Sequence, residues 1–235
     1  MNDFIPQGLL RHSGVVLRRT SSPEGNLSLY LLLRTVGPQW VSAPGASRGR
    51  MRFGGSVEPL VWGNFNLYKG TKRLYLKSVD VSEDFWALRR DPERLRILLE
   101  WDRLLSLHLV PGHPCDDVLA IFYWSSILVR QGVHPLLAEW RFLWKWLNAW
   151  GLAPSLEQCV TCGTTLANGH WTATGLQCDR CGRGSSIPAD VLRQFRIVAG
   201  APIRELEERS SAAVEGEEIW RDGCRRLKMF LEYVR

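Results

Sequence analysis

The chain has 235 residues, of which 45% are hydrophobic and 23% are charged, so the composition fits a folded globular protein and excludes a disordered one. The longest apolar stretch, residues 118–129, is too short to cross a bilayer, which argues against a membrane-spanning segment. The net charge is +6 at neutral pH, and this charge is unevenly distributed along the chain.

Positive charge is concentrated in the first third of the chain. Residues 1–78 contain eleven Lys or Arg residues against three acidic residues, an excess of eight positive charges, whereas the remainder is close to neutral. A basic module attached to a near-neutral body favours binding to a polyanion such as nucleic acid. A solvated basic surface without a partner is the alternative interpretation.

The same basic third predicts a small β-barrel. Short stretches rich in β-forming residues are separated by turn residues such as those at 22–26 and 69–71. Five short strands are typical of an OB-fold, which we expect over residues 1–80 as a nucleic-acid-binding domain. Pro59 lies early in the fourth strand, so that strand should start at an edge or carry a bulge. The predicted strands cover residues 15–17, 27–36, 40–41, 57–68 and 74–81.

A loop rich in Gly and Arg follows the third predicted strand. Arg48, Arg50 and Arg52 alternate with small residues within 43–55, a segment that cannot build a core. Guanidinium groups form bidentate contacts with phosphate, so we predict that this loop is exposed and contacts nucleic acid.

Aromatic residues of the barrel could add a surface on which bases stack, although most of them should lie in the core. Because side chains alternate along a strand, Trp62 and Tyr68 should share one face and Phe65 should lie on the other. These residues therefore cannot all face one ligand. The aromatic residues considered are Trp40, Phe53, Trp62, Phe65, Tyr68 and Tyr75.

After residue 81 the hydrophobic pattern becomes helical, and we predict an α-helical domain over residues 81–235. Asp91 and Pro92 have the residue types of an N-cap and a first helical position. Further helices are expected from residue 116 to Gly132, from Pro135 to Gly151, and over 188–199, 202–209 and 217–234. The predicted fold class is therefore α+β.

The apolar residues of these helices predict stripes that face a core. The positively charged residues Arg221, Arg225, Arg226 and Lys228 should project away from the stripe of the last helix. Cys224 lies in that stripe and is interpreted as a buried apolar residue, while Cys115 has no partner at a telling spacing. The predicted stripes are Leu95, Leu98, Leu99, Leu105 and Leu109; Leu119, Ile121, Trp124 and Leu128; Leu136, Trp140, Leu143, Trp144, Leu147 and Trp150; and Trp220, Cys224, Leu227, Leu231 and Val234.

Four cysteines form two Cys-x-x-Cys pairs with the spacing of a metal site. Cys159 and Cys162 are separated from Cys178 and Cys181 by the 15 residues 163–177. Four thiolates close a tetrahedral Zn²⁺ shell, so we predict a structural zinc ribbon inserted at about 155–186. Two disulfides or four ordinary cysteines are the alternative. A glycine follows each pair, Trp171 is expected to pack over the site, and His170 could compete as a ligand.

No catalytic motif accompanies these features, and we predict that the protein is not an enzyme. A closed four-thiolate shell leaves no open position for substrate, which disfavours a zinc-dependent hydrolase. A protein–protein scaffold is the remaining structural alternative. No export signal is recognised, and thiolate-type cysteines favour a reducing compartment, so we expect a cytoplasmic, nucleoid-associated protein.

The passage that joins the third helix to the first cysteine pair resembles a known family. Residues 146–163 read Trp-Leu-Asn-Ala-Trp-Gly-Leu-Ala-Pro-Ser-Leu-Glu-Gln-Cys-Val-Thr-Cys-Gly, which is similar to the DNA repair and recombination protein RecO family. Residues 14–19, 24–34, 54–60 and 226–228 also resemble that family. The similarity extends over nearly the whole chain, and the cysteine passage is its most specific part.

The resemblance implies a recombination mediator that binds single- and double-stranded DNA, anneals complementary strands, and helps to load the recombinase RecA together with RecR. It also implies an interaction with the C-terminal tail of the single-stranded-DNA-binding protein. Pro44 stands where the family usually has a lysine. An RNA-binding or transcription accessory protein with an OB-fold and a zinc ribbon is the alternative. The residues predicted to contact DNA are Arg18, Arg19, Arg34, Arg48, Arg50, Arg52, Lys72 and Arg73.

Overall fold

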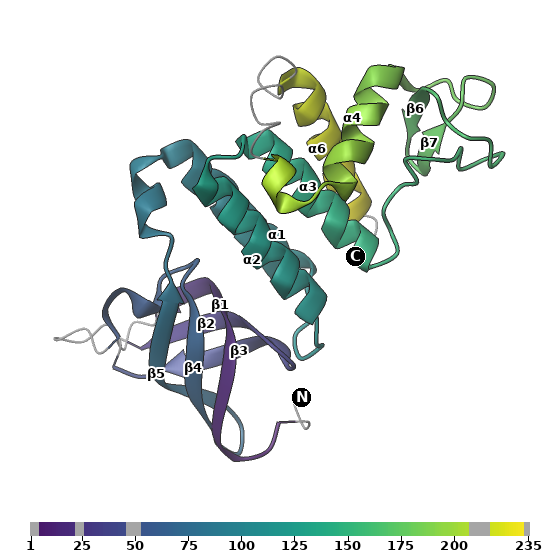
Figure 1. Cartoon of the computed structure of the whole chain (residues 1–235). Coiled ribbons are helices and arrows are strands. Elements are labelled where there is room, and N and C mark those ends of the chain that lie inside the picture. The colour runs from purple at the N-terminus through teal and green to yellow at the C-terminus, as the bar shows by residue number, and fades with distance from the viewer. Residues whose placement is uncertain (1–4, 22–25, 46–52, 207–216, 233–235) are drawn as a thin grey trace. The chain divides into compact units, whose positions relative to one another are not determined.

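The structure is a computed structural model that describes residues 5–21, 26–45, 53–206 and 217–232. The chain divides into two compact units, 1–123 and 124–235, which are described separately (Figure 1). The loop residues Arg48, Arg50 and Arg52 lie outside the described residues, as does Val234. The predicted domain boundary at residue 80 stays a prediction.

Five strands of the first unit form a closed barrel in the order β1-β2-β3-β5-β4 (Figure 1). The pairing of β3 with β5 is parallel and the other pairings are antiparallel, which is the strand order of an OB-fold. The predicted fold class is thus confirmed. The strands are β1 (Gly8–Ser21), β2 (Leu27–Leu33), β3 (Gly37–Ala43), β4 (Trp62–Lys69) and β5 (Leu74–Glu83).

Side chains alternate between the inside and the outside of the barrel along each strand, and the inward ones fill its core. Phe65 and Leu67 of β4 point inward and belong to the same buried cluster as Leu29 and Leu31 of β2. Trp62 lies on the opposite face of β4, where it packs against Phe122 and Tyr123 of α2 (Asp116–Gln131) at centroid distances of 5.3 and 5.1 Å. Tyr68, on the same face as Trp62, is exposed. The predicted division of these aromatic residues between two faces is confirmed.

The fourth strand begins later than its hydrophobic pattern predicts. Val57 ends a short 3₁₀ helix, η1 (Gly54–Val57), and β4 starts only at Trp62, so Pro59 lies before the strand. The intervening backbone bonds to β1, because Leu60 N donates to Val16 O at 2.9 Å and Val16 N donates to Val61 O at 3.0 Å. The bulge expected from Pro59 occurs instead at the Trp62/Gly63 step. The prediction of a strand over 57–61 was wrong.

The helix start predicted at Asp91 is confirmed. The Asp91 carboxylate accepts a 3.2 Å hydrogen bond from Arg94 N and caps α1 (Pro92–His108), which follows the 3₁₀ helix η2 (Trp86–Arg90). The predicted stripe is only partly correct. Leu98 and Leu105 are buried, but Leu95 is half-buried and Leu99 is exposed, because the buried face of α1 is centred on Trp101. In α2, Ile121 is half-buried and Trp124 is exposed.

The helices α3 (Pro135–Ala149), α4 (Ala189–Gly200) and α6 (Glu217–Glu232) of the second unit share an aromatic core. Trp140 stacks on Phe195 at a centroid distance of 4.8 Å, and Trp220 meets Phe195 edge-on at 5.1 Å. The predicted burial of Trp220, Cys224, Leu227 and Leu231 is confirmed. A small sheet in the order β7-β6-β8 carries the cysteine segment; its strands are β6 (Gly169–Thr172), β7 (Gly175–Gln177) and β8 (Ser185–Ile187).

The basic residues of α6 do not all project from the unit. Lys228 Nζ lies 2.8 Å from Oε1 of Glu139, a carboxylate buried in α3. Arg226 bonds to Asp222 and lies over the ring of Trp171 at 5.9 Å. The prediction that these two side chains project away was therefore wrong. In the part of the chain that the structure describes, no helix has the length and apolarity needed to cross a membrane.

Candidate metal centre and nucleic-acid interface

Each Cys-x-x-Cys pair lies on a tight backbone turn. Gly163 N donates to Cys159 O at 2.9 Å, and Gly182 N donates to Cys178 O at 2.8 Å, so the two turns close with the same bond. Gly163 has a φ of 71°, a conformation that favours glycine. Gly182 is needed for a different reason: a Cβ at this position would lie 2.7 Å from the Cβ of His170, which is too close for any other residue.

The two turns bring four sulfur atoms together. The Sγ atoms of Cys159, Cys162, Cys178 and Cys181 all lie within 4.8 Å of one another, and those of Cys162 and Cys178 are 3.7 Å apart. A tetrahedral metal with Zn–S bonds of about 2.3 Å would hold its sulfurs about 3.8 Å apart. All four cysteines are free thiols, so the alternative of two disulfides is not observed. The spacing of the four sulfur atoms therefore fits a single metal ion bound by four thiolates.

The thiols of the cluster interact with one another, and their pKa values are shifted in opposite directions. Hydrogen bonds with Thr164 lower the pKa of Cys162 to about 6, with further contributions from the neighbouring cysteines. Hydrogen bonds with Cys162 and Cys178 raise the pKa of Cys181 to about 12, because they retain its proton. Four crowded thiols can all become thiolates only when a cation balances their charge, which is what a bound metal supplies.

His170 is close to the cysteines but is bonded elsewhere. Its Nε2 lies 2.9 Å from Oδ1 of Asp179, and its Nδ1 lies 3.1 Å from the carbonyl oxygen of Gly184. The hydrogen bond with Asp179 raises the pKa of His170 above its usual range. Both ring nitrogens therefore have partners, and His170 does not join the four-sulfur cluster as a ligand. Asp179 also accepts a hydrogen bond from Asn168.

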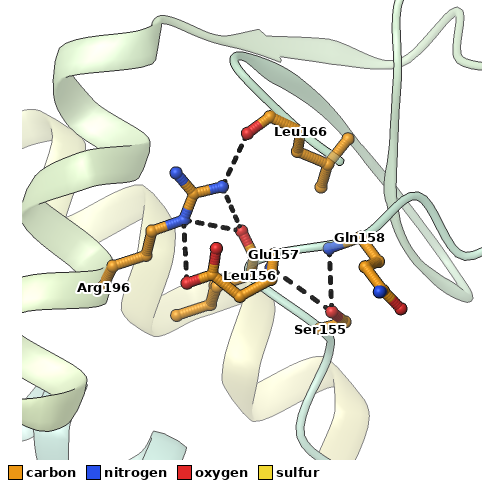
Figure 2. Close-up of polar contacts among 6 residues, drawn as sticks. All are labelled: Ser155, Leu156, Glu157, Gln158, Leu166 and Arg196. Carbon is orange, nitrogen blue, oxygen red and sulfur yellow. Dashed lines mark hydrogen bonds and ion pairs between the residues drawn. The ribbon is translucent and has the colours of Figure 1, made fainter. Parts of the chain in front are cut away.

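Arg196 of α4 connects the cysteine segment to the helices (Figure 2). Its guanidinium donates to the carbonyl of Leu156 at 2.9 and 2.7 Å and to the carbonyl of Leu166 at 2.7 Å, and it forms an ion pair with Glu157 at 3.2 Å. Leu156 and Leu166 flank the turn of Cys159. Arg196 therefore holds both ends of the segment that supplies the first two sulfurs.

Trp171 makes the second connection between the cysteine segment and the helices. Its buried ring lies 6.5 Å from the ring of Phe230 in α6, beneath the guanidinium of Arg226. Trp171 thus packs against α6. Arg196 and Trp171 therefore connect the cysteine segment to α4 and to α6, respectively.

The predicted DNA-contacting residues Arg18 and Arg19 of β1 and Arg34, in the turn after β2, are exposed, and two of them face an acidic side chain. Arg19 forms an ion pair with Glu58, and Arg34 lies 3.7 Å from Asp116. The charge of Arg18 acts on Asp102, a carboxyl of α1 whose pKa is raised well above its usual range by burial and is lowered only in part by Arg18. The charges of Arg19 and Arg34 are therefore locally compensated, whereas burial favours the neutral form of Asp102 beside Arg18.

The turn between β4 and β5 is different, and we call residues 69–77 the basic hairpin. Lys72, Arg73 and Lys77 are exposed and Lys69 is half-buried; none of the four forms an ion pair with any residue that the structure describes. A 2.9 Å hydrogen bond from Gly70 N to Arg73 O closes the turn. Lys69 and Lys77 were not predicted as site residues. The sequence could have indicated both lysines, because no Asp or Glu that could neutralise them occurs between Glu58 and Asp80.

The chain thus combines an OB-fold barrel that carries a basic hairpin with a helical unit that carries a four-cysteine module. The family model described as "Recombination protein O C terminal" matches residues 119–234. Among curated proteins, "DNA repair protein RecO" of Anaeromyxobacter dehalogenans (strain 2CP-C) is 31% identical over 234 residues, covering 94% of this chain and 89% of the relative.

Two further relatives carry the same printed name. The protein of Acetivibrio thermocellus is 25% identical over 73% of this chain and 70% of its own length. That of Bacillus pumilus is 25% identical over 74% of this chain and 68% of its own length. The chain belongs to the RecO family of recombination proteins.

Proposed function

We propose that this protein is a recombination mediator in DNA repair that binds single- and double-stranded DNA, anneals complementary strands and helps to load the recombinase together with RecR. It acts by binding and not by catalysis. The relatives named as DNA repair proteins support the biological setting. The single observation that carries the binding role is the basic hairpin, where four cations without described acidic partners meet at one turn.

The basic hairpin suits a recombination mediator because its positive side chains would contact phosphates and would not select particular bases. Lys and Arg side chains that neutralise phosphates give affinity that depends on salt and tolerates any sequence, as the handling of arbitrary broken DNA requires. Annealing needs two strands held on neutralised charge while their base edges stay free to pair. The remaining proposed DNA contacts are the surface residues Arg18, Arg19 and Arg34 and the loop residues Arg48, Arg50 and Arg52.

The metal we propose is Zn²⁺, held by Cys159, Cys162, Cys178 and Cys181. The support is the all-sulfur donor set and the 3.7 Å separation of two of its sulfurs. With four protein ligands the ion would have no open coordination position, so its role would be structural. Arg196 and Trp171 then transmit that stability to α4 and α6.

The proposed partners are those that the family implies: RecR, the C-terminal tail of the single-stranded-DNA-binding protein, and RecA indirectly. Membership of the RecO family supports these partners. The proposed location is the cytoplasm at the nucleoid, with no membrane association.

Strand annealing tests the proposed function. Two complementary oligonucleotides, one labelled with a fluorophore and one with a quencher, are mixed with and without single-stranded-DNA-binding protein, and quenching is followed after the full chain is added. We expect faster annealing, also on strands coated with the binding protein. No acceleration would refute the annealing role, and tighter binding to RNA than to DNA of matched sequence would favour the transcription accessory alternative.

A further inference from the structure

A row of large side chains crosses the outside of the barrel beside the basic hairpin. Leu9 of β1 pairs with Tyr68 of β4, and Tyr68 pairs with Tyr75 of β5. The flanking pair Leu67 and Leu76 is buried inside the barrel, so the alternation of side chains directs Leu9, Tyr68 and Tyr75 outward. We call these three residues the outer row.

The outer row is accessible to solvent to different degrees. The exposed fraction is 80% for Leu9 and 42% for Tyr68, and Tyr75 is half-buried. The two tyrosine rings flank Gly70: a Cβ on that glycine would lie 3.4 Å from Cε2 of Tyr75 and 3.9 Å from Cε1 of Tyr68. Both rings therefore reach the closing turn of the basic hairpin.

A strand irregularity places a cation against this row. The pairing of β4 with β5 shifts between Asn66 and Leu67, where β5 contains one additional residue, Lys77. Lys77 is exposed, and its Nζ lies 5.3 Å from the centre of the Tyr68 ring. The bulge thus brings a positive charge next to an exposed aromatic ring, a combination that suits a nucleotide, with its flat base and its charged phosphate.

We propose that the outer row is a base-stacking surface for single-stranded nucleic acid, with the cations of the basic hairpin holding the phosphates on either side. This inference rests on the proposed DNA-binding function and specifies where single strands are held. Four cations without an acidic residue between positions 58 and 80 select a polyanion. The exposed Tyr68 and the half-buried Tyr75 would then favour a polyanion with accessible flat rings, which a single-stranded nucleic acid provides.

The geometry favours single strands over duplex. A duplex hides the faces of its bases within the stack and presents phosphates, so it can contact the cations but not the tyrosine rings. A single strand can contact both. We therefore expect the outer row to contribute to single-strand affinity alone, while Lys72 and Arg73 contribute to the affinity for both forms.

The test compares full-length variants by fluorescence anisotropy with a labelled oligothymidylate and with a duplex of equal length. Tyr68→Leu/Tyr75→Leu removes both rings but keeps apolar side chains, and Tyr68→Phe/Tyr75→Phe is the matched control that keeps the rings. The leucine variant should lose about tenfold or more in oligothymidylate affinity for each base that loses its stacking partner, and none for the duplex. Lys72→Gln/Arg73→Gln should weaken binding to both.

An abasic oligonucleotide of the same length separates stacking from charge. It retains the phosphates but has no bases, so the leucine variant and the unmodified chain should bind it equally. If the unmodified chain binds oligothymidylate and the leucine variant binds it just as tightly, the outer row is not a stacking surface, although the proposed function stands. If the unmodified chain binds no DNA, the proposed function fails as well.

Cross-linking of the unmodified chain gives a second measurement that does not depend on how a variant folds. An oligonucleotide that contains 5-iodouracil is irradiated in complex with the protein, and the adducts are mapped by mass spectrometry. Adducts at Tyr68 or Tyr75 support the proposal. Adducts found only at other aromatic residues, such as Trp40 on β3, overturn it.

Discussion

The guanidinium of Arg196 donates a 2.7 Å hydrogen bond to the carbonyl oxygen of Leu166, so a helix of the second unit holds the far end of the first Cys-x-x-Cys turn (Figure 2). The same side chain also holds the near end, through the carbonyl of Leu156. One residue outside the ligand set thereby governs the geometry of two ligands.

Replacing Arg196 by Gln should loosen the metal centre. The substitution removes charged hydrogen bonds to two backbone carbonyls, which lowers the local stability by about 2 kcal/mol or more. We expect faster metal release to a chromogenic chelator. The control is Arg193→Gln, since Arg193 is an exposed residue of the same helix. Equal release rates from both variants would contradict the positioning role of Arg196.

Removing one ligand should remove the metal. Cys159→Ser is expected to abolish stoichiometric metal content and to lower the unfolding temperature, because binding energy of a structural metal is folding energy. Cys115→Ala and Cys224→Ala should retain the metal, since neither sulfur belongs to the cluster. Elemental analysis of the purified variants provides the measurement. A full metal complement in Cys159→Ser would show that the ligand set is wrong.

Cations with and without acidic neighbours should differ in their effect on DNA binding. Lys72→Gln or Arg73→Gln should reduce the salt dependence of single-strand affinity by about 0.7 in slope for each phosphate that the variant no longer neutralises. Arg19→Gln and Arg34→Gln should reduce it less, because Glu58 and Asp116 already neutralise these charges. Titrations at several salt concentrations measure the slopes. An equal reduction in all four variants would contradict the distinction.

The raised pKa of Asp102 predicts how the free energy of unfolding depends on pH. Burial raises the pKa of its carboxyl, so the folded protein binds this proton more tightly than the unfolded chain does. Its contribution to stability is therefore fully present below the ordinary aspartate pKa of about 4 and is lost as the pH rises toward the raised folded pKa. Each unit by which the pKa is raised corresponds to about 1.4 kcal/mol.

Asp102→Asn should thus be more stable than the unmodified chain at neutral pH and should lose this part of the pH dependence. Urea unfolding at mildly acidic and neutral pH measures both effects. The matched control is Asp117→Asn, because Asp117 is exposed. A variant that is less stable at neutral pH would indicate that the charged form of Asp102 is needed, through its attraction to Arg18.

Features with a local cause could be predicted from the sequence. The spacing of the cysteines was enough to predict that their sulfurs gather, and the Asp91-Pro92 pair was enough to locate the start of α1, because a cap bonds to a residue three positions away. The number of strands in the barrel was predicted from short β-rich stretches separated by turn residues. These signals involve residues that are close in the chain.

Features with a distant cause could not be predicted. Val57 and Val61 are buried as a strand would require, yet backbone hydrogen bonds with Val16, more than forty positions away, hold this segment out of the strand. Likewise, Arg19 and Lys72 are both basic residues in the sequence. Only the fold shows that Glu58 lies beside Arg19, while no described acidic group lies beside Lys72. The sequence does not encode such pairings in any short pattern.

The closure of the barrel has a dynamic consequence. β3 and β5 join through only two residue pairs, Val41 with Leu74 and Ser42 with Tyr75, whereas β2 and β3 share a ladder of seven. A short ladder of backbone hydrogen bonds should open locally more often than a long one, so backbone amides of the β3–β5 pairing should exchange with deuterium early. Tyr75 belongs to this pairing, and an oligonucleotide bound at Tyr75 should stabilise it. Deuterium uptake at Val41 and Leu74 should therefore slow once the oligonucleotide is bound.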